Sequence, residues 1–535
     1  MDRLKALLER GYFPAELPPP FNTKDLAKHR AYVDTQWSTL GDPPRTSYAT
    51  YSFPRVRKLR RVLAITNPIS QFYLCKLIAH NWPELSKHIR RSKCALAVLK
   101  ISAQEDRAVS PPDFGLVALR RSEISARFDH TLVSDFSRFY GTLYTHAIAW
   151  ALHGKIWCKN NLHSVTFKSS LGNRLDIAVR KGQDNQTIGI PVGPDTSRII
   201  SEVVAVAIDI KVQEALNLNQ SRALRHVDDW YIGFDGAGEA EDAISAVAVA
   251  SREFEIELNT EKTKTLNLVT TVEAVWPNEI RRFYFPPGKS PQQRALEHFF
   301  TIVFHHAAAN PEENVIDFAL KRTRGVSISR ENWRLYETFL LKAARSNGTV
   351  LPGCIQVLVN YNFRGFPLDK DRISKLINDL IREHAPLGNT AEVSWALFLA
   401  KGLKLKIDKS AANLVSSLEN PVCALLALDL KKRKLIGQLD TRLWRRSMNA
   451  DGLKSGMWLL AYEADIKGWL IGTPPDFVDV HPFFSVLKSK KVSFYDEKKN
   501  VSGLTKRVPK KPSSSVASFR QSANLPMSSI VGFEY

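Results

Sequence analysis

Two adjacent carboxylates at a predicted turn are the residues of this chain best suited to chemistry. In the run 224–234 (LRHVDDWYIGF), β-prone residues lie on both sides of Asp228 and Asp229. This pattern predicts a strand, a tight turn and a returning strand. Two like charges at a hairpin tip repel each other, so a fold that keeps them there normally supplies cations. Mg²⁺ binds carboxylate oxygens and keeps open positions for substrate phosphates, whereas an isolated Asp-Asp pair is more often only a polar turn.

A third carboxylate follows another predicted strand. The β-branched run 131–134 ends at Asp135, and the apolar segment 143–154 after it is predicted to be helical. An Asp in this place can bind a metal, although Asp also caps helices. From Asp135 onward the predicted order is strand, helix, helix, hairpin, helix, strand, which is close to the split β-α-β arrangement. That topology would bring Asp135 to the hairpin and form a site for two metal ions, one activating a hydroxyl and one holding a triphosphate.

Other segments are predicted to surround this site. Basic residues lead into a β-prone run over 55–65, which suits a strand that presents Arg61 to phosphates, although a solvated basic strand is the alternative. A loop rich in Gly and Pro precedes a helix that begins near 195, and Gly193 there permits close approach to a base or sugar. Later strands are expected over 254–258 and near 266–268, whereas 155–188 is polar and is expected to be irregular.

Charge and composition limit the function classes. Lys and Arg number 75 against 54 Asp and Glu, a formal net charge of +21, which favours a polyanionic partner and first of all nucleic acid. The five cysteines never form a C-x-x-C pair, which is typical of reduced thiols in a cytosolic protein. No signal peptide or run of membrane-spanning length is found, so the sequence predicts a soluble intracellular protein. A chain of 535 residues is expected to form two or three domains.

The motifs together resemble those of a reverse transcriptase, and more closely those of the bacterial abortive-infection and defence-associated reverse transcriptases. The segments similar to the four motifs of that group, in the right order, are 134–140 (SDFSRFY), 186–197 (QTIGIPVGPDTS), 226–229 (HVDD) and 258–263 (LNTEKT). His226 stands where most reverse transcriptases have Tyr or Phe, and Val192 where many have Gln. These departures put ordinary templated copying in doubt more than catalysis, because all three carboxylates are present.

The resemblance implies a role for each matching residue. Asp135, Asp228 and Asp229, with the backbone carbonyl of Phe136, would bind two Mg²⁺ ions, with Mn²⁺ as a possible substitute. Lys262 would protonate the departing pyrophosphate, and Arg61 would contact the incoming triphosphate. Tyr140 would exclude a ribose 2′-hydroxyl. The residues implied to lie near substrate, primer or template are Gly193, Pro194 and His226.

The resemblance also implies an α+β fold with several domains. Residues 1–54 are expected to form an N-terminal arm made extended by prolines, and 55–285 the fingers and a split β-α-β palm. Short helical blocks over 286–487 predict an all-α domain, which the resemblance identifies as HEAT-like, although no fixed sequence period is found. Residues 488–535 are rich in Lys and then in Ser, and are predicted to form a flexible tail that holds single-stranded nucleic acid, docks a subunit or stays solvated.

The leading hypothesis is therefore a Mg²⁺-dependent DNA polymerase of bacterial antiphage defence that uses deoxynucleoside triphosphates (dNTPs) in the cytoplasm. By resemblance, it would start on a protein hydroxyl, extend without a conventional template and assemble into a homo-oligomer, a trimer or hexamer. A second protein from the same operon is a further expected partner. One alternative is a retron-like reverse transcriptase that copies a dedicated non-coding RNA. The alternative from another class is a catalytically silent scaffold that binds nucleic acid.

Overall fold

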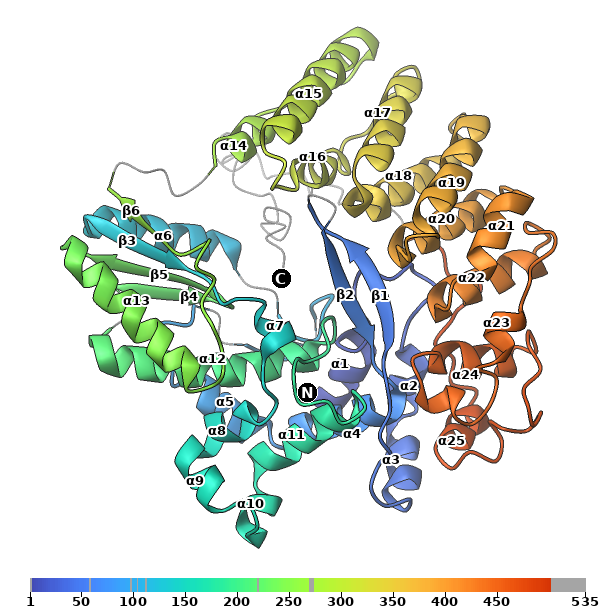
Figure 1. The fold of residues 1–535 in the computed structure, drawn as a ribbon. Coiled ribbons are helices and arrows are strands. Elements are labelled where there is room, and N and C mark those ends of the chain that lie inside the picture. Colours follow the sequence, from blue (N-terminus) through green and yellow to red (C-terminus); the bar gives the residue numbers. More distant parts are fainter. Residues whose placement is uncertain are drawn as a thin grey trace, which may run out of the picture.

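The chain folds into a helix-rich structure with small antiparallel sheets. The computed structural model describes residues 2–56, 59–96, 99–102, 104–110, 113–218, 221–268 and 274–501. Figure 1 shows the N-terminal half around a four-stranded sheet, and the C-terminal helices arranged in an arc on the other side of strands β1 and β2. None of the helices among these residues is long and apolar enough to span a membrane.

Helices make up most of the N-terminal half. Their bounds are α1 Arg3–Arg10, α2 Lys24–Lys28, α3 Arg30–Ser38, α4 Pro68–His80, α5 Trp82–Ile89, α6 Phe114–Arg127, α7 Phe139–Thr142, α8 Ala147–His153, α9 Lys155–Asn160, α10 Val165–Ser169, α11 Leu171–Lys181, α12 Asp195–Leu216, α13 Ala237–Arg252 and α14 Trp276–Arg281. Helices α4, α8, α12 and α13 agree with the segments predicted to be helical.

The four-stranded sheet has the strand order β4-β5-β3-β6. Its strands are β3 His130–Ser134, β4 Ala223–His226, β5 Asp229–Phe234 and β6 Lys264–Asn267, and all neighbours are antiparallel. The first strand and the Asp-Asp hairpin are therefore adjacent, as the split β-α-β pattern predicts, because Ser134 pairs with Trp230. Helix α13 packs on one face of the sheet, and α6 packs on the other face through Val117 and Ile124.

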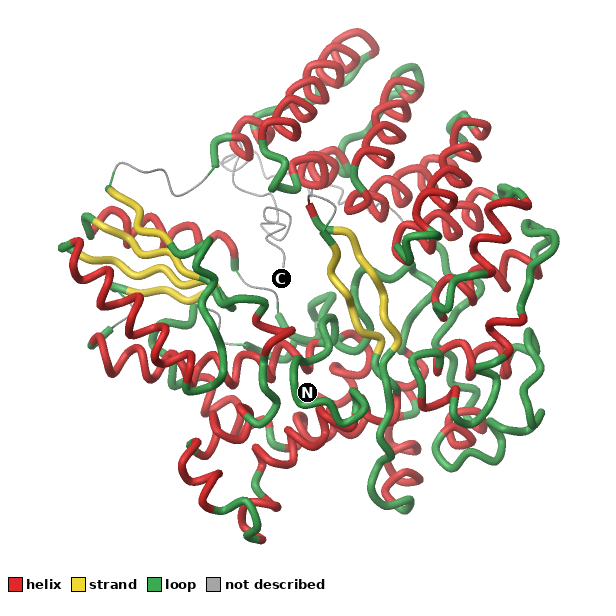
Figure 2. Tube along the Cα trace, in the orientation of Figure 1, coloured by secondary structure: helices red, strands yellow, loops and turns green. Residues whose placement is uncertain are grey.

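A separate two-stranded sheet connects the two halves. Figure 2 shows strands β1 (Ala49–Pro54) and β2 (Arg60–Ile65) standing apart from the larger sheet. Arg60 pairs with Glu392 of the C-terminal half at 2.5 Å between Nη1 and Oε1, and the amide of Ser52 donates to Thr390 Oγ1 at 2.8 Å. This sheet therefore fixes the helical half against the N-terminal half.

The C-terminal half consists of paired helices in two layers. Their bounds are α15 Lys289–Ala309, α16 Val315–Thr323, α17 Trp333–Ser346, α18 Leu351–Phe363, α19 Lys370–His384, α20 Thr390–Leu403, α21 Lys409–Ser416, α22 Pro421–Lys432, α23 Arg442–Arg445, α24 Trp458–Ile466 and α25 Phe484–Ser489. Helix α19 buries one face only, through residues such as Ile373, Ile377 and Ile381, whereas α20 and α22 are buried almost all round. Helices α18, α20, α22 and α24 are successive neighbours in the inner layer. This pairing agrees with the predicted stacked pairs, and the HEAT-like assignment stays a prediction.

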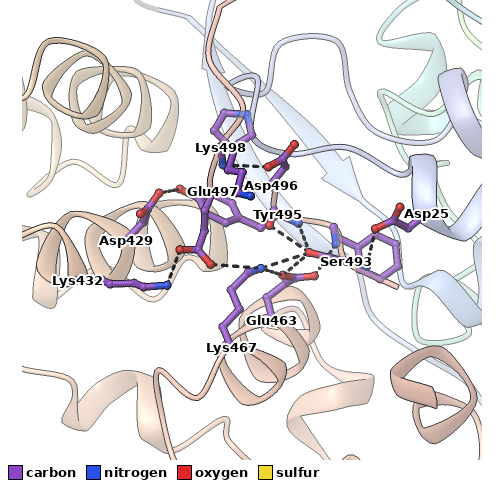
Figure 3. Close-up of polar contacts among 12 residues, drawn as sticks. Asp25, Asp429, Lys432, Glu463, Lys467, Ser493, Tyr495, Asp496, Glu497 and Lys498 are labelled. Carbon is purple, nitrogen blue, oxygen red and sulfur yellow. Dashed lines mark hydrogen bonds and ion pairs between the residues drawn. The ribbon is translucent and has the colours of Figure 1, made fainter. Parts of the chain in front are cut away.

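The N-terminal segment and the described part of the predicted tail, 488–501, differ from the expected arm and tail. Phe13 and Phe21 near the N-terminus are buried, as are Phe494 and Tyr495, and Phe21 forms an antiparallel bridge with Tyr495. The prolines restrict the backbone of the first segment but do not keep it from packing. The segment 488–501 therefore packs on the folded structure through Val492, Phe494 and Tyr495 (Figure 3), and the rest of the predicted tail, 502–535, lies outside the described residues.

Two internal predictions were wrong. Residues 155–188 contain helices α9, α10 and α11 instead of irregular chain; α11 buries Leu171, Leu175 and Val179, a narrow stripe within a polar sequence. The alternating run 254–258 is not a strand, because Glu255 adopts a left-handed conformation with φ of 61° that interrupts the extended backbone. Leu258 makes only an isolated bridge, to Phe136.

Candidate active site

Three acidic side chains from distant parts of the chain meet at one end of the four-stranded sheet. Asp135 directly follows β3, Asp228 lies in the β4–β5 turn, and Asp229 begins β5. Each offers a carboxylate oxygen, and these oxygens all lie within 4.8 Å of one another. The backbone carbonyl of Asp135 also accepts a hydrogen bond from the amide of Asn259 at 2.7 Å, which fixes the end of β3 against the segment that carries Lys262.

A buried ion network between β4 and α12 stabilises the Asp-Asp turn. Val227 has a φ of 59°, an uncommon conformation for a β-branched residue. Its carbonyl accepts a hydrogen bond from Arg225 Nη1 at 2.6 Å, and the same guanidinium pairs with Glu202 at 2.6 Å and with Asp209 at 2.7 Å. Arg225 is only 1% exposed, and both acids belong to α12. The longest helix of the N-terminal half therefore determines where the turn, and with it Asp228, is placed.

The carboxylate cluster carries more negative charge than its surroundings compensate. Burial and the charges of Asp135 and Asp229 raise the pKa of Asp228 well above its usual range. Burial and the charge of Asp135 raise the pKa of Asp229 to about 6, although Arg121 and Lys262 oppose this shift. Repulsion within the cluster would be relieved by a cation placed among the three oxygens.

Lys262 is a cation in direct contact with the cluster. Its Nζ lies 2.6 Å from Asp135 Oδ2, and its side chain is 62% exposed. Burial lowers the pKa of Lys262, but the hydrogen bond to Asp135 and the charges of the three carboxylates outweigh this and raise it. The ammonium group therefore stays charged, and it can move toward an anion that enters the site because its stem is exposed.

The cluster fits a hard divalent cation such as Mg²⁺. Oδ1 of Asp135 is buried, and no donor among the described residues forms a hydrogen bond to it. Such an orphaned oxygen is costly in a folded protein, and it becomes satisfied when it binds a metal ion. Carboxylate oxygens are the ligands that Mg²⁺ prefers, and the three here lie within 4.8 Å of one another.

The predicted Gly-Pro loop lies between β2 and α12. The amide of Ala64 in β2 donates to the carbonyl of Val192 at 2.8 Å, and Pro194 is the N-cap of α12. Gly193 has a φ of 123°, and a Cβ there would come within 2.7 Å of Pro14. Glycine is therefore required at this position by the packed N-terminal segment. This explanation is structural, so contact of Gly193 and Pro194 with substrate stays a prediction.

The remaining predicted residues lie at different places around the cluster. Tyr140 is half-buried, and its hydroxyl accepts a hydrogen bond from Ser201 Oγ of α12 at 3.1 Å. Burial, which the Ser201 bond only partly offsets, raises its pKa to about 12, with a contribution from the charge of Asp228. The Phe136 ring is buried against Phe139, and Arg61 belongs to the other sheet, where it pairs with Phe53.

His226 is directly opposite Asp229 in the β4–β5 pair. Its ring packs edge-on against Phe114 of α6, with 5.7 Å between the centroids. Burial and the nearby guanidinium groups, including that of Arg121, lower its pKa to about 4, so the imidazole is neutral near pH 7. The His in place of an aromatic residue therefore acts here as an uncharged packing group between the hairpin and α6.

Sequence reasoning missed four residues that support the cluster. Arg225, Glu202 and Asp209 form the network under the turn, and Arg121 of α6 lies 4.0 Å from the ring centroid of Tyr231. One signal was present, because Glu202 and Asp209 are acids seven positions apart in the largely apolar stretch 199–210 of α12 and so share one face. An arginine three residues before the Asp-Asp pair is the matching cation.

Comparisons with known proteins leave the family open. No family model matches the chain, and no curated protein matches it. Among solved structures it is similar to apo telomerase from Candida tropicalis truncated from its C-terminal domain, with 13% identity and a TM-score of 0.29, over 46% of this chain and 56% of that one.

Two similar structures are telomerases in complex with the TWJ fragment of telomeric RNA. The one from Candida albicans has 14% identity and a TM-score of 0.30, over 74% of this chain and 68% of that one. The one from Candida tropicalis has 13% identity and a TM-score of 0.29, over 71% and 65%. The chain thus spans roughly half to two thirds of the length of these telomerases. Likenesses at these TM-scores carry no argument, so the functional assignment rests on the geometry of the site.

Proposed function

We propose that this protein is a Mg²⁺-dependent nucleotidyltransferase, a DNA polymerase of the reverse-transcriptase type. The observation that carries the proposal is the meeting of Asp135, Asp228 and Asp229, whose carboxylate oxygens lie within 4.8 Å of one another. They come from a strand end and an adjacent hairpin of one antiparallel sheet, and Lys262 contacts them. This combination suits the transfer of a nucleotidyl group from a triphosphate, which needs charge neutralisation more than covalent chemistry.

The side chains present have distinct tasks in this proposal. Bound Mg²⁺ ions would supply the Lewis-acid chemistry that activates the attacking hydroxyl and neutralises the triphosphate. Asp135 and the Asp-Asp pair would bind these ions, with the backbone carbonyl of Phe136 as a further ligand. Lys262 would leave Asp135 to pair with, and protonate, the departing pyrophosphate. Tyr140, whose hydroxyl is held by Ser201, would present its ring to the sugar and disfavour a 2′-hydroxyl.

The finer assignment rests on the motif resemblance. It supports a role in bacterial antiphage defence, in the cytoplasm, with synthesis that starts on a protein hydroxyl and proceeds without a conventional template. It also supports a homo-oligomer, and contact of Arg61, Gly193 and Pro194 with nucleotide or primer. The departures at Val192 and His226 favour this form of synthesis over copying of a dedicated RNA.

The experiment is incubation of the purified protein with labelled dNTPs and Mg²⁺, followed by denaturation. We expect label that stays with the protein and is released by proteolysis. We also expect incorporation to fall at least about 10³-fold in Asp228→Asn/Asp229→Asn, because both side chains act on the reacting phosphates. Arg222→Gln, which removes a partly exposed ion pair with Glu239 just before β4, is the matched control and should keep activity.

Three results would redirect the proposal. Product complementary to an RNA that co-purifies in fixed ratio would identify the retron-like alternative. Free DNA without attached protein would remove protein priming but keep the polymerase. Absence of incorporation with any nucleotide, together with phage protection that survives Asp228→Asn/Asp229→Asn, would leave the silent scaffold.

A further inference from the structure

Cations crowd the surface where the C-terminal ends of α20, α22 and α24 meet. We call this surface the basic edge, and it consists of the cationic residues of 404–406 and 431–434 together with Lys24, Lys467, Lys498 and Lys499. All of these side chains are exposed except that of Lys467, which is half-buried. They come from five separate segments of the chain, so the folded structure, and not a run in the sequence, brings them together.

Hydrogen bonds between these segments establish that they are neighbours. The amide of Ile407 donates to the carbonyl of Leu435 at 2.9 Å, which joins the loops that follow α20 and α22. Arg433 Nη2 donates to the carbonyl of Glu497 at 2.7 Å, so the C-terminal segment crosses the end of α22. The N-terminal segment is joined to it by the hydrogen bond from the amide of Asn22 to the carbonyl of Phe494 at 3.0 Å.

A cavity of about 680 Å³ opens at the centre of the basic edge. Its cationic lining residues are Lys24, Lys432, Arg433, Lys467 and Lys498, and Asp25, Asp496 and Glu497 are its acids. Figure 3 shows most of these side chains, with Lys432 and Lys467 both directed toward Glu497. A cavity of this volume has room for one unpaired nucleotide, whereas a base of a duplex would first have to leave the stack.

Three of the five cations that line the cavity are paired with acids, but the other cations of the basic edge are not paired with any described acid. Lys432 pairs with Glu497 at 2.7 Å, Arg433 with Asp429 at 2.7 Å, and Lys467 with Glu463 at 3.3 Å. The other lysines of the basic edge form no ion pair with any residue that the structure describes. Uncompensated cations at this density attract a polyanion and its condensed counterions.

Two of these lysines occupy backbone positions that favour glycine. Lys404, the C-cap of α20, has a φ of 57°, and Lys434, two residues after the end of α22, has a φ of 59°. Helices commonly end with Gly or Asn in this left-handed conformation, which glycine adopts without steric cost. Attraction of a cation to a helix C-terminus stabilises only the last turn, and it does not account for Lys24, Lys498 and Lys499.

The basic edge is remote from the carboxylate cluster. The N-terminal ends of α20 and α22 contact β1, through Thr390 with Ser52 and through the side-chain amide of Asn420 with the carbonyl of Thr50 at 2.8 Å. Helix α22 has 12 residues and is therefore about 18 Å long, so its C-terminal end lies well away from β1. In Figure 1 the sheet that carries the acids lies on the opposite side of β1 and β2.

We propose that the basic edge is a second nucleic-acid site, which binds the phosphate backbone of a single strand and admits one nucleotide into its cavity. The site does not depend on catalysis at Asp135, Asp228 and Asp229. It would hold a strand by counterion release, with an affinity that falls as salt rises.

The test is binding of a labelled 20-nucleotide oligouridylate to the full chain, over a range of salt concentrations, in EDTA and without dNTPs. In Lys404→Gly/Lys434→Gly the slope of log affinity against log salt should become shallower by about 1.4, because each phosphate contact in a single strand contributes about 0.7. The melting temperature of this variant should not fall, because glycine relieves the left-handed conformation. A binding loss would therefore not reflect unfolding.

The matched control is Lys159→Gln/Lys168→Gln, which removes the same charge from exposed lysines of α9 and α10. We expect its slope to equal that of the unchanged protein. An unchanged slope in Lys404→Gly/Lys434→Gly, or an equal loss in the control, would overturn the proposal. Equal affinity for a 20-base-pair duplex would overturn the single-strand preference. Because no nucleotide is incorporated under these conditions, an inactive polymerase and an unused basic edge give different results.

Discussion

Buried carboxylates occur in both halves of the molecule, but their surroundings differ. In the C-terminal half, Asp429 is completely buried and receives an ion pair from Lys401 at 2.8 Å, another from Arg433 at 2.7 Å and a hydrogen bond from the Tyr495 hydroxyl at 2.7 Å. Burial alone would raise the pKa of Asp429, but these partners outweigh it and lower the pKa. In the N-terminal half, the pKa of Asp228 is raised, because burial and two neighbouring carboxylates act on it together.

This difference indicates which acids the fold uses for structure and which it keeps for chemistry. A buried charge is tolerated when cations and donors match it, as around Asp429. A cluster without enough cations destabilises the metal-free protein, so its presence is explained by a ligand that supplies positive charge. This criterion supports the proposal that Asp135, Asp228 and Asp229 serve function. Burial also raises the pKa of Glu463 and of Asp209, but Lys467 and Arg225 are paired with those two acids.

Replacement of Arg225 is expected to have the largest effect on stability, because it leaves two buried acids without the cation that neutralises them. Arg225→Gln leaves Glu202 and Asp209 buried without their cation, directly below the Asp-Asp turn. We expect the free energy of unfolding to fall by about 3–5 kcal/mol, measured by urea unfolding. Arg222 directly precedes β4, where it makes a partly exposed ion pair with Glu239 and a hydrogen bond to the Gly233 carbonyl, so Arg222→Gln should cost only about 1–2 kcal/mol. Equal losses of unfolding free energy in the two variants would show that neutralisation of the buried acids by Arg225 does not determine stability.

The network around Arg225 also shows what the sequence could and could not predict. The Asp-Asp hairpin and its pairing with β3 followed from local β propensity and from the order of elements, which a single chain displays directly. The left-handed turn at Val227 and the three-residue network did not, because they depend on which residues of α12 face the hairpin after folding. The packing of the N-terminal segment was missed for the same reason, since the burial of Phe21 and Tyr495 depends on their mutual contact.

Replacement of Asp by uncharged Asn is expected to change the free energy of unfolding in opposite directions at Asp429 and at the Asp-Asp pair. Asp429→Asn leaves Lys401 buried without its anion and should lower the free energy of unfolding by about 3 kcal/mol. Asp228→Asn/Asp229→Asn removes repulsion and should raise it by about 1–2 kcal/mol in EDTA, as is common when a functional site is neutralised. Both changes in the free energy of unfolding would be measured by urea unfolding at pH 7. A loss of stability in both cases would contradict the claim that the hairpin acids are under-compensated.

The smallest expected effect is a difference in pH dependence. A carboxyl whose pKa is raised in the folded state binds more protons than in the unfolded state, so ionisation of Asp228 and Asp229 costs stability as pH rises. The window begins near the usual pKa of Asp, 3.8, and extends through about 6 for Asp229 and higher for Asp228. In EDTA, the unchanged protein should therefore lose about 1–2 kcal/mol relative to Asp228→Asn/Asp229→Asn between pH 5 and pH 8.

The difference in stability between the unchanged protein and Asp228→Asn/Asp229→Asn isolates the titration of these two acids from that of other groups in the same pH range. Burial raises the pKa of Glu463 to about 7, and that residue contributes equally to both. Saturating Mg²⁺ should remove the gap, because an ion that binds the three carboxylates replaces the missing positive charge. Ionisation of Asp429 affects stability in the opposite direction. Because its pKa is lowered in the folded state, it stabilises the fold above the usual pKa of Asp, and this stabilisation is lost as the pH falls. A gap that stays constant from pH 5 to pH 8, or that Mg²⁺ leaves unchanged, would mean that the hairpin acids are matched like Asp429 and do not form a metal site.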